Sequence, residues 1–366
     1  MLILAGFAIQ AEAGSLPFGV NAGAVIIDQA GRRVNARRPY HRIISLYGAH
    51  TENLYSLGLD AEIIGVSPNE AYPPMARSKT VFSYHDDPEK FMAARPDLVL
   101  IRPMIDRGYP QLVQRLEKSA ITVVSLQPGT IDEMYVYWEI LGILTGKQDR
   151  AQQMSAQFKH KVSEIESLTA PILTKKKVYF EAIHKQMKTF APDAMAMFAL
   201  NTAGGVNIAQ DAQQVRSTNI AYYGKERILS HADEIDVFIA QQGAMNRPTI
   251  ALIKAESGFS AIKAIKNNQI LIIDEMIVSR PTLRLIDGIL EIGRFLYPKI
   301  FNPEKPGPLG SVRDIWLCPR VLCLKSQITS TKKQTSSKLQ APKNKQAPNY
   351  KHQKTNKLQT TSTKFQ

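Results

Sequence analysis

Short apolar runs alternate with helical patterns along most of the chain. The runs are four or five residues long, and apolar residues recur every three or four positions in the segments between them. A run that is apolar throughout is typical of a strand buried on both faces, and strands separated by helices indicate a mainly parallel sheet. The strands predicted in this way are Ile43–Leu46, Ile63–Val66, Leu98–Ile101, Thr122–Leu126, Val178–Glu181, Val237–Ala240 and Ile270–Ile273.

Two consecutive helices divide these strands into two series. Thr130 followed three residues later by Glu133 is a capping box, which predicts a helix start. A longer pattern over Asp149–Leu168 follows and stops before Pro171. At 1.5 Å per residue this second helix is about 30 Å long, enough to link two lobes as one strut. We therefore predict an N-terminal lobe (24–147), an interlobe helix (148–170) and a C-terminal lobe (171–301), with a hairpin at Ala24–Val34 and further helices at Ala194–Thr202, Lys225–His231 and Pro281–Leu296.

The N-terminal segment has the pattern of a secretory signal. Met1–Ile9 is apolar, and Ala11-Glu12-Ala13 resembles a small-x-small cleavage site. The basic residues that usually open a signal are missing, and the alternative interpretation is a buried N-terminal strand. We expect residues 1–13 to be a signal-peptide remnant cleaved after Ala13, and the mature protein to be exported.

The C-terminal segment explains most of the charge of the chain. The net charge of +14 suggests a nucleic-acid ligand, but residues 307–366 hold 12 of the 46 basic residues and a single acid, Asp314. The rest of the chain is close to neutral, so no nucleic-acid binding is predicted for the folded body. We expect residues 302–366 to be disordered, and we set them apart from the fold because Gly307–Ser311 resembles a cloning-vector sequence.

Catalytic signatures are missing from the sequence. Both cysteines, Cys318 and Cys323, lie in the C-terminal segment, which excludes thiol chemistry and a zinc knuckle in the body. Gly142–Lys147 resembles a phosphate loop but has three residues between its glycines instead of four. We therefore predict a binding protein rather than an enzyme.

The residues around the first strand resemble a known family. Arg42–Leu46 is followed by Tyr47-Gly48-Ala49-His50-Thr51-Glu52, by Leu57-Gly58 and by Ile63–Ser67. This order is similar to the opening of periplasmic binding proteins for cobalamin, haem and iron–siderophore complexes. The resemblance runs from about Ala24 to Ile300 and includes Asp87–Lys90, Arg95–Leu100, Gly224–Leu229, Asp236–Ile239 and Ser279–Pro281.

The resemblance implies a fold, a ligand class and a partner. The fold is α/β, with two Rossmann-like lobes bridged by a single long α-helix, the helical-backbone metal-receptor type. It implies no intrinsic cofactor: a corrinoid or ferric siderophore is the bound ligand, and the partner is a membrane ABC permease. In the family one surface glutamate per lobe docks on the permease, which points to Glu89 and Glu226; the alternative is an acid favoured by the helix dipole. We expect a monomer.

Candidate ligand-binding residues follow the predicted strands. Tyr47 and His50 lie on the predicted loop after the first strand, and each candidate has a plain alternative as a surface or core residue. Arginine offers a planar fork for a carboxylate or phosphate. The set is Tyr47, His50, Tyr84, His85, Arg102, Arg216, Tyr222 and Arg280, with Tyr223 as a weaker candidate.

Three rival functions remain open at this point. A haem or free-metal binding protein would share the fold. A cytoplasmic metallocofactor enzyme of related two-lobed fold would need cysteine ligands that the body does not contain. A nucleic-acid binder would depend on the basic segment after Gly307.

Overall fold

The computed structural model describes residues 17–21, 25–70, 72–216 and 218–302. Within them, the long strands form two separate sheets, one on each side of a long helix in the sequence. The first sheet with its helices is called the N-terminal lobe, the long helix the interlobe helix, and the second sheet with its helices the C-terminal lobe. The expected signal remnant and the basic segment from Pro303 onward lie outside the described residues.

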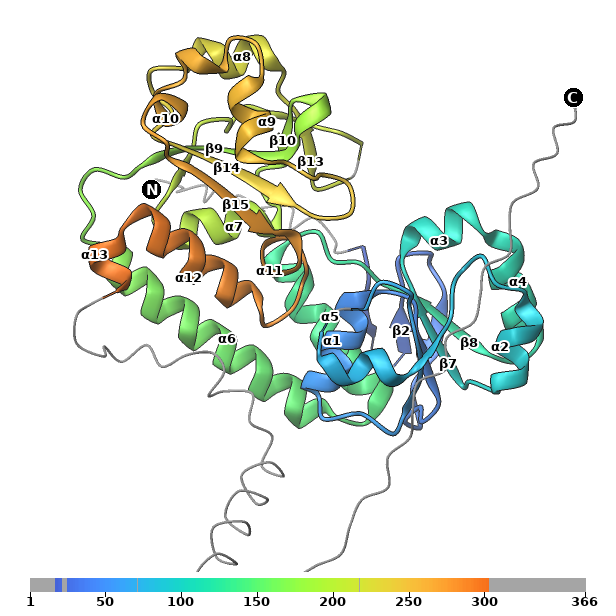
Figure 1. Ribbon diagram of the computed structural model, residues 1–366. Helices are drawn as coiled ribbons and strands as arrows, with labels where there is room; N and C mark the ends of the chain where they lie inside the picture. Colours follow the sequence, from blue (N-terminus) through green and yellow to red (C-terminus); the bar gives the residue numbers. More distant parts are fainter. Residues whose placement is uncertain (1–16, 22–24, 71, 217, 303–366) are drawn as a thin grey trace, which may run out of the picture. The chain divides into compact units, whose positions relative to one another are not determined.

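The sheet of the N-terminal lobe is parallel throughout, with strand order β6-β5-β4-β7-β8 (Figure 1). Its central strands are buried on both faces, as their apolar sequences predict. The strands are β4 (Ile43–Ser45), β5 (Ile63–Val66), β6 (Thr80–Val81), β7 (Leu98–Ile101) and β8 (Thr122–Ser125); the helices are α1 (Gly48–Ser56), η1 (Pro74–Ser78), α2 (Pro88–Ala94), α3 (Pro103–Gly108), α4 (Pro110–Lys118) and α5 (Ile131–Thr145).

The sheet of the C-terminal lobe is mixed, which differs from the mainly parallel sheet predicted. Its strands β9, β14 and β15 are parallel, and β11 also pairs in parallel with β9. Three short strands at one edge, β10, β12 and β13, pair antiparallel. The strands are β9 (Lys177–Ile183), β10 (Lys188–Phe190), β11 (Val206–Asn207), β12 (Gln213–Gln214), β13 (Ile220–Tyr222), β14 (Val237–Gln242) and β15 (Ile270–Asp274).

Short helices connect these strands, and a longer one closes the lobe. The longest is α12, which is buried along one face and packs on α7. The helices are η2 (His184–Gln186), α7 (Met195–Thr202), α8 (Lys225–Ser230), α9 (Ile250–Ala255), η3 (Phe259–Ala261), α10 (Lys263–Lys266), α11 (Glu275–Val278), α12 (Leu285–Leu296) and α13 (Pro298–Phe301).

The interlobe helix α6 (Gln148–Thr169) packs on helices of both lobes. It contacts α5 of the N-terminal lobe and α7 and α12 of the C-terminal lobe (Figure 1). The ring of Phe158 lies 5.5 Å from Trp138 of α5 and 6.3 Å from Phe198 of α7. One hydrophobic cluster therefore runs from the N-terminal sheet to α12. The cluster is continuous because α6 has apolar residues that face both lobes.

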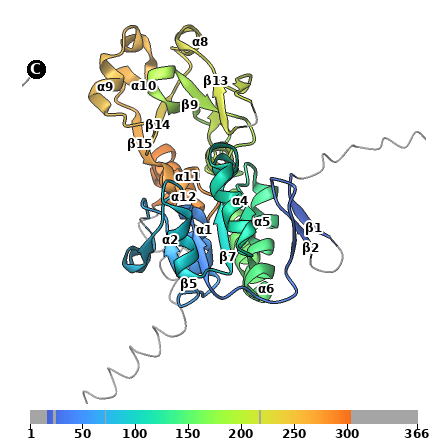
Figure 2. The same ribbon diagram turned by 90° about the vertical axis from the view of Figure 1, so that its right-hand side faces the viewer.

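A three-stranded antiparallel sheet precedes the N-terminal lobe. It consists of β1 (Gly19–Asn21), β2 (Val25–Ile27) and β3 (Arg33–Asn35), and the predicted hairpin is its β2–β3 part. Figure 2 shows β1 and β2 beside α5, and β1 contacts that helix. None of the described helices is long and apolar enough to cross a membrane.

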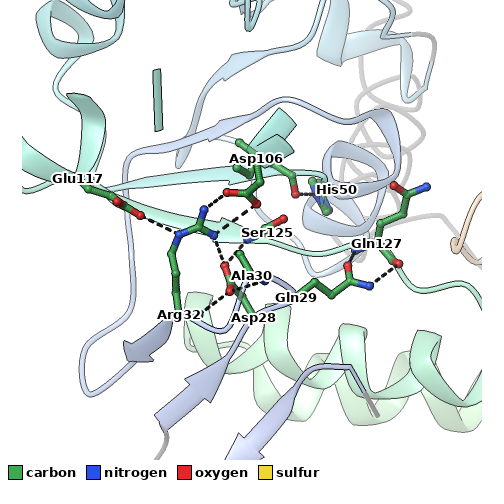
Figure 3. A network of polar contacts seen from close by, with 10 residues as sticks. Asp28, Gln29, Ala30, Arg32, His50, Asp106, Glu117, Ser125 and Gln127 are labelled. Atoms are coloured by element: carbon green, nitrogen blue, oxygen red, sulfur yellow. Dashed lines mark hydrogen bonds and ion pairs between the residues drawn. The ribbon is translucent and has the colours of Figure 1, made fainter. Parts of the chain in front are cut away.

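A buried carboxylate and a half-buried arginine attach the hairpin to the lobe. Asp28 is 1% exposed, and its carboxylate accepts hydrogen bonds from the Arg32 guanidinium at 2.5 Å and from the Ser125 amide at 2.9 Å. Arg32 also pairs with Asp106 and Glu117, so three acids surround one guanidinium (Figure 3). The attachment fixes the hairpin to the end of β8 and to α3.

Candidate functional site

Tyr47 and Arg102 meet at the carboxyl edge of the N-terminal sheet. Tyr47 follows β4 and is the N-cap residue of α1, and Arg102 follows the neighbouring strand β7. The Arg102 guanidinium carbon lies 4.7 Å from the centre of the Tyr47 ring, a cation–π distance. Burial raises the pKa of Tyr47 against the opposing effect of Arg102 and Arg280, which keeps the phenol protonated. These two candidate residues are therefore in direct contact in the structure.

Arg280 reaches this edge from the C-terminal lobe. Its Nη1 lies 3.1 Å from Oε1 of Glu52 on α1, and Nε of Arg284 lies 3.1 Å from Oε2 of the same carboxylate. A Cβ on Gly48 would lie 2.3 Å from Nη1 of Arg280, so the guanidinium occupies space that only glycine leaves open. Arg280 thus packs on the first turn of α1, next to Tyr47.

Further polar contacts join the lobes at the same junction. The carbonyl of Pro281 accepts hydrogen bonds from Asn53 at 2.9 Å and from the Trp138 indole at 3.3 Å. Four buried polar atoms here have no hydrogen-bond partner within the described residues. They are Asn53 Oδ1, Glu70 Oε2, Thr282 Oγ1 and Arg284 Nη2.

Glu275 adds an acid from the end of β15. It is the first residue of α11, and its Oε2 accepts a hydrogen bond from the Ala244 amide at 3.2 Å. A Cβ on Gly243 would lie 1.9 Å from that oxygen, so glycine is required at this close approach. Glu275 is near enough to raise the pKa of Tyr47 electrostatically, so the two residues lie in one neighbourhood.

His50 is not where the sequence predicts it. The expected loop position is wrong: His50 is in the first turn of α1 and is 0% exposed. Its Nε2 lies 3.1 Å from the Ile101 carbonyl and its Nδ1 lies 2.7 Å from the Tyr137 hydroxyl. Burial lowers the pKa of His50 to about 3, so the ring is neutral. Because both ring nitrogens have protein partners, neither is available to a ligand in this structure.

Tyr84 and His85 form an aromatic group with Tyr109, in which the rings are tilted or edge-on to one another. The ring centres of Tyr84 and Tyr109 are 4.7 Å apart, and the Tyr109 hydroxyl lies 3.1 Å from Nδ1 of His85. His85 is exposed and Tyr84 half-buried. Tyr109 was not a candidate from the sequence. It lies between the short helices α3 and α4, 24 positions after His85, and does not follow a predicted strand.

The remaining candidates lie on the antiparallel edge of the C-terminal lobe. Tyr222 on β13 is 55% exposed, and the Lys188 ammonium lies 4.4 Å from its ring centre. Arg216 is exposed in the turn before β13. Tyr223, the weaker candidate, is 5% exposed and packs in the core against Tyr179, which argues against a ligand role.

Glu89 and Glu226 occupy equivalent places in the two lobes. Each is exposed in the first turn of a short helix, α2 or α8, that leads into a buried parallel strand. Glu89 forms an ion pair with Arg115 of α4. Within the described residues, Glu226 has no ion pair, because its neighbours Lys225 and Arg227 pair with other acids.

No metal centre unites the candidates within the described residues. Among the described residues, no group of three or more His, Cys, Asp or Glu side chains is arranged to hold a metal ion. A cavity of about 410 Å³ has walls from both lobes, at the starts of α5 and α7, but no predicted ligand residue lines it. Its lining residues are Thr130, Ile131, Asp132, Pro192, Asp193, Phe198 and Asn201.

Sequence reasoning missed the acids of the site. Glu52 appears in the sequence only as part of the Thr51-Glu52 helix start, and its partners are more than 220 positions away. Glu275 follows a predicted strand and could have been found by the rule that led to Tyr47 and Arg102. A search for charged residues directly after every predicted strand would have found it.

Comparisons with known proteins point to one family of binding proteins. The profile of a family described as periplasmic binding proteins matches residues 43–276. An ABC transporter substrate-binding lipoprotein of Bacillus subtilis is 25% identical over 284 residues, 76% of this chain and 87% of the relative. A vitamin B12-binding protein of Vibrio cholerae is 24% identical over 263 residues, 70% of this chain and 90% of the relative.

Solved structures show the same fold. A possible iron-binding periplasmic solute-binding protein from Staphylococcus epidermidis has a TM-score of 0.62 and 28% identity, covering 71% of this chain and all of that one. A periplasmic haem-binding protein from Pseudomonas aeruginosa has a TM-score of 0.61 and 18% identity, covering 75% of this chain and 96% of that one. The two-lobed fold predicted from the sequence is thereby confirmed.

Proposed function

The chain belongs to the periplasmic binding protein family, and on that premise we propose that it is the solute-binding component of an ABC importer for a metal chelate, a corrinoid or a ferric siderophore. The proposal places the protein outside the cytoplasm, as a monomer, and assigns no reaction to it. The names of the relatives support the ligand class, since they include vitamin B12-binding and possible iron-binding proteins.

One observation in this chain carries the proposal. Tyr47, Arg102 and Arg280 are gathered at the carboxyl edge of the N-terminal sheet, where ligands of open α/β sheets bind. An aromatic ring with two guanidinium groups in its neighbourhood suits a large conjugated or chelated molecule that carries anionic groups. The exposed Tyr222 and the Tyr84–His85–Tyr109 group are further candidate contacts from the two lobes.

Absorbance titration tests the ligand class. Purified protein is titrated with cyanocobalamin, haemin and a ferric siderophore, and we expect a saturable spectral shift with one equivalent of one chelate. Arg102→Ala should weaken that binding about tenfold or more, because a charged contact is lost. Arg150→Ala, an exposed arginine on α6, is the matched control and should bind like the wild type. A shift with haemin alone would favour the haem alternative, and equal binding by Arg102→Ala would remove the proposed site.

Docking on a permease is tested separately. We propose that Glu89 and Glu226 contact basic residues of the permease, because two separated charge pairs fix the orientation of a complex better than one. Glu89→Gln and Glu226→Gln should lower chelate uptake into vesicles that contain the permease and leave chelate affinity unchanged. Glu139→Gln, an exposed acid on α5, is the control. Normal uptake by the Glu89→Gln/Glu226→Gln double variant would contradict this part of the proposal.

A further inference from the structure

Glu52 cannot touch a ligand, yet it holds a candidate ligand residue. It is 2% exposed and lies within α1. Its two oxygens are divided between Arg280 and Arg284, each at 3.1 Å, and both arginines come from the C-terminal lobe. Among the candidate ligand residues, Arg280 is therefore the one that Glu52 holds by a direct ion pair.

The geometry ties Arg280 to the N-terminal lobe. Its guanidinium is bonded to Glu52 and fills the space over Gly48, both on α1. Tyr47 is the N-cap residue of the same helix, and Arg102 packs on the Tyr47 ring at 4.7 Å. A guanidinium held from its own lobe would move with that lobe. One held by α1 keeps its place relative to Tyr47 and Arg102.

We propose that Glu52 is a positioning residue that fixes Arg280 beside Tyr47 and Arg102, so that two guanidinium groups form a preassembled subsite for an anionic group of the ligand. The inference rests on the proposed function for the identity of the ligand, but not for the positioning itself. Preassembly favours affinity because less side-chain freedom is lost on binding.

The negative charge of Glu52 is what allows the two guanidinium groups of Arg102 and Arg280 to lie in one neighbourhood. Arg102 and Arg280 would repel each other without a nearby acid, and Glu52 offsets part of that charge from a buried position. A buried carboxylate that is removed leaves its arginine partners uncompensated, so they turn toward water or another acid. Arg284 pairs with the same carboxylate, but its guanidinium lies 4.5 Å from the ring centre of Tyr72. It therefore serves as the internal comparison.

The first experiment needs no ligand. The side-chain ¹H–¹⁵N signals of arginine are recorded, with Arg280 assigned from Arg280→Lys. We expect slowly exchanging Arg280 signals in the wild type and in Arg284→Gln, and their loss in Glu52→Gln. Gly48→Ala, whose Cβ would lie 2.3 Å from Arg280 Nη1, should displace the guanidinium without changing any charge. Unchanged Arg280 signals in both Glu52→Gln and Gly48→Ala would overturn the proposal.

The second experiment measures coupling with ferric citrate as the anionic probe. Glu52→Gln and Arg280→Gln should each weaken binding about tenfold, and the double variant should be no weaker than either alone, because both remove one interaction. Fully additive losses would overturn the positioning role. Glu52→Asp keeps the charge and replaces Glu52→Gln if that variant does not fold; it should weaken binding less than Arg280→Gln does. If no chelate binds the wild type, the proposed function fails, while the Arg280 signals still decide the positioning role.

Discussion

His50 gives the sharpest prediction about pH and stability. The Ile101 carbonyl can only accept a hydrogen bond, so Nε2 of His50 carries the proton and Nδ1 accepts from the Tyr137 hydroxyl. The Tyr137 oxygen in turn accepts from the Asn53 amide at 3.3 Å. A proton on Nδ1 would face the Tyr137 hydroxyl with no acceptor for the phenolic hydrogen. Protonation therefore breaks a fully buried network.

The magnitude follows from the pKa. The pKa of His50 is lowered from 6.5 to about 3 in the folded protein. Because the folded pKa is lowered, the stabilising contribution is present above pH 6.5 and is lost as the pH falls toward 3, since the unfolded chain binds the proton first. Between pH 8 and pH 5 the loss is about 2 kcal/mol.

Urea unfolding of the wild type and His50→Gln measures this loss. Glutamine does not titrate, so the difference between the two proteins isolates the histidine from other groups. We expect the free energy of unfolding of the wild type to fall by about 2 kcal/mol more than that of His50→Gln over this range. If the free energies of unfolding of the two proteins change equally with pH, or if an imidazole NMR signal of His50 titrates near pH 6.5, the assignment of His50 as a buried neutral ring is refuted.

Two further predictions concern the interlobe helix and the attachment of the hairpin. Phe158→Ala should destabilise the protein by about 3–5 kcal/mol, because the ring is 1% exposed and packs between α5 and α7. A loss of unfolding free energy of less than about 1 kcal/mol, measured by urea unfolding, would contradict a core shared by the two lobes. Asp28→Ala should cost about 3 kcal/mol, because it leaves Arg32 and the Ser125 amide without their buried acceptor. Hydrogen exchange at the Ser125 amide checks it, and unchanged protection would show that the hairpin is not held there.

The longer parallel strands could be predicted from the sequence to within two residues at each end, whereas the two-residue parallel strands β6 and β11 were missed. β5 and β7 have the predicted bounds, because continuous apolar runs between polar turns leave little choice. The antiparallel edge was missed, since β12 is only Gln213–Gln214 and is exposed. Such a strand forms because β13 pairs with it by hydrogen bonds. The pattern of apolar residues in the sequence does not indicate this pairing.

The site was only partly predictable from the sequence, because several of its contacts join residues that are far apart along the chain. Tyr47 and Arg102 follow apolar strands, so the position of the strand ends identifies them. The burial of His50 depends on Tyr137, which lies 87 positions away, and the pairing of Glu52 with Arg280 spans 228 positions. Contacts at that separation are set by how the lobes pack on α6, and a single sequence does not contain them.

Native mass spectrometry with a mixture of chelates tests the central claim most directly. The protein is incubated with cobalamin, haem and ferric siderophores together, and its intact mass is recorded under non-denaturing conditions. We predict one added mass that corresponds to a single chelate per chain, and its loss when the protein is denatured. A spectrum that shows only the unliganded chain across the whole mixture would contradict a chelate-binding function.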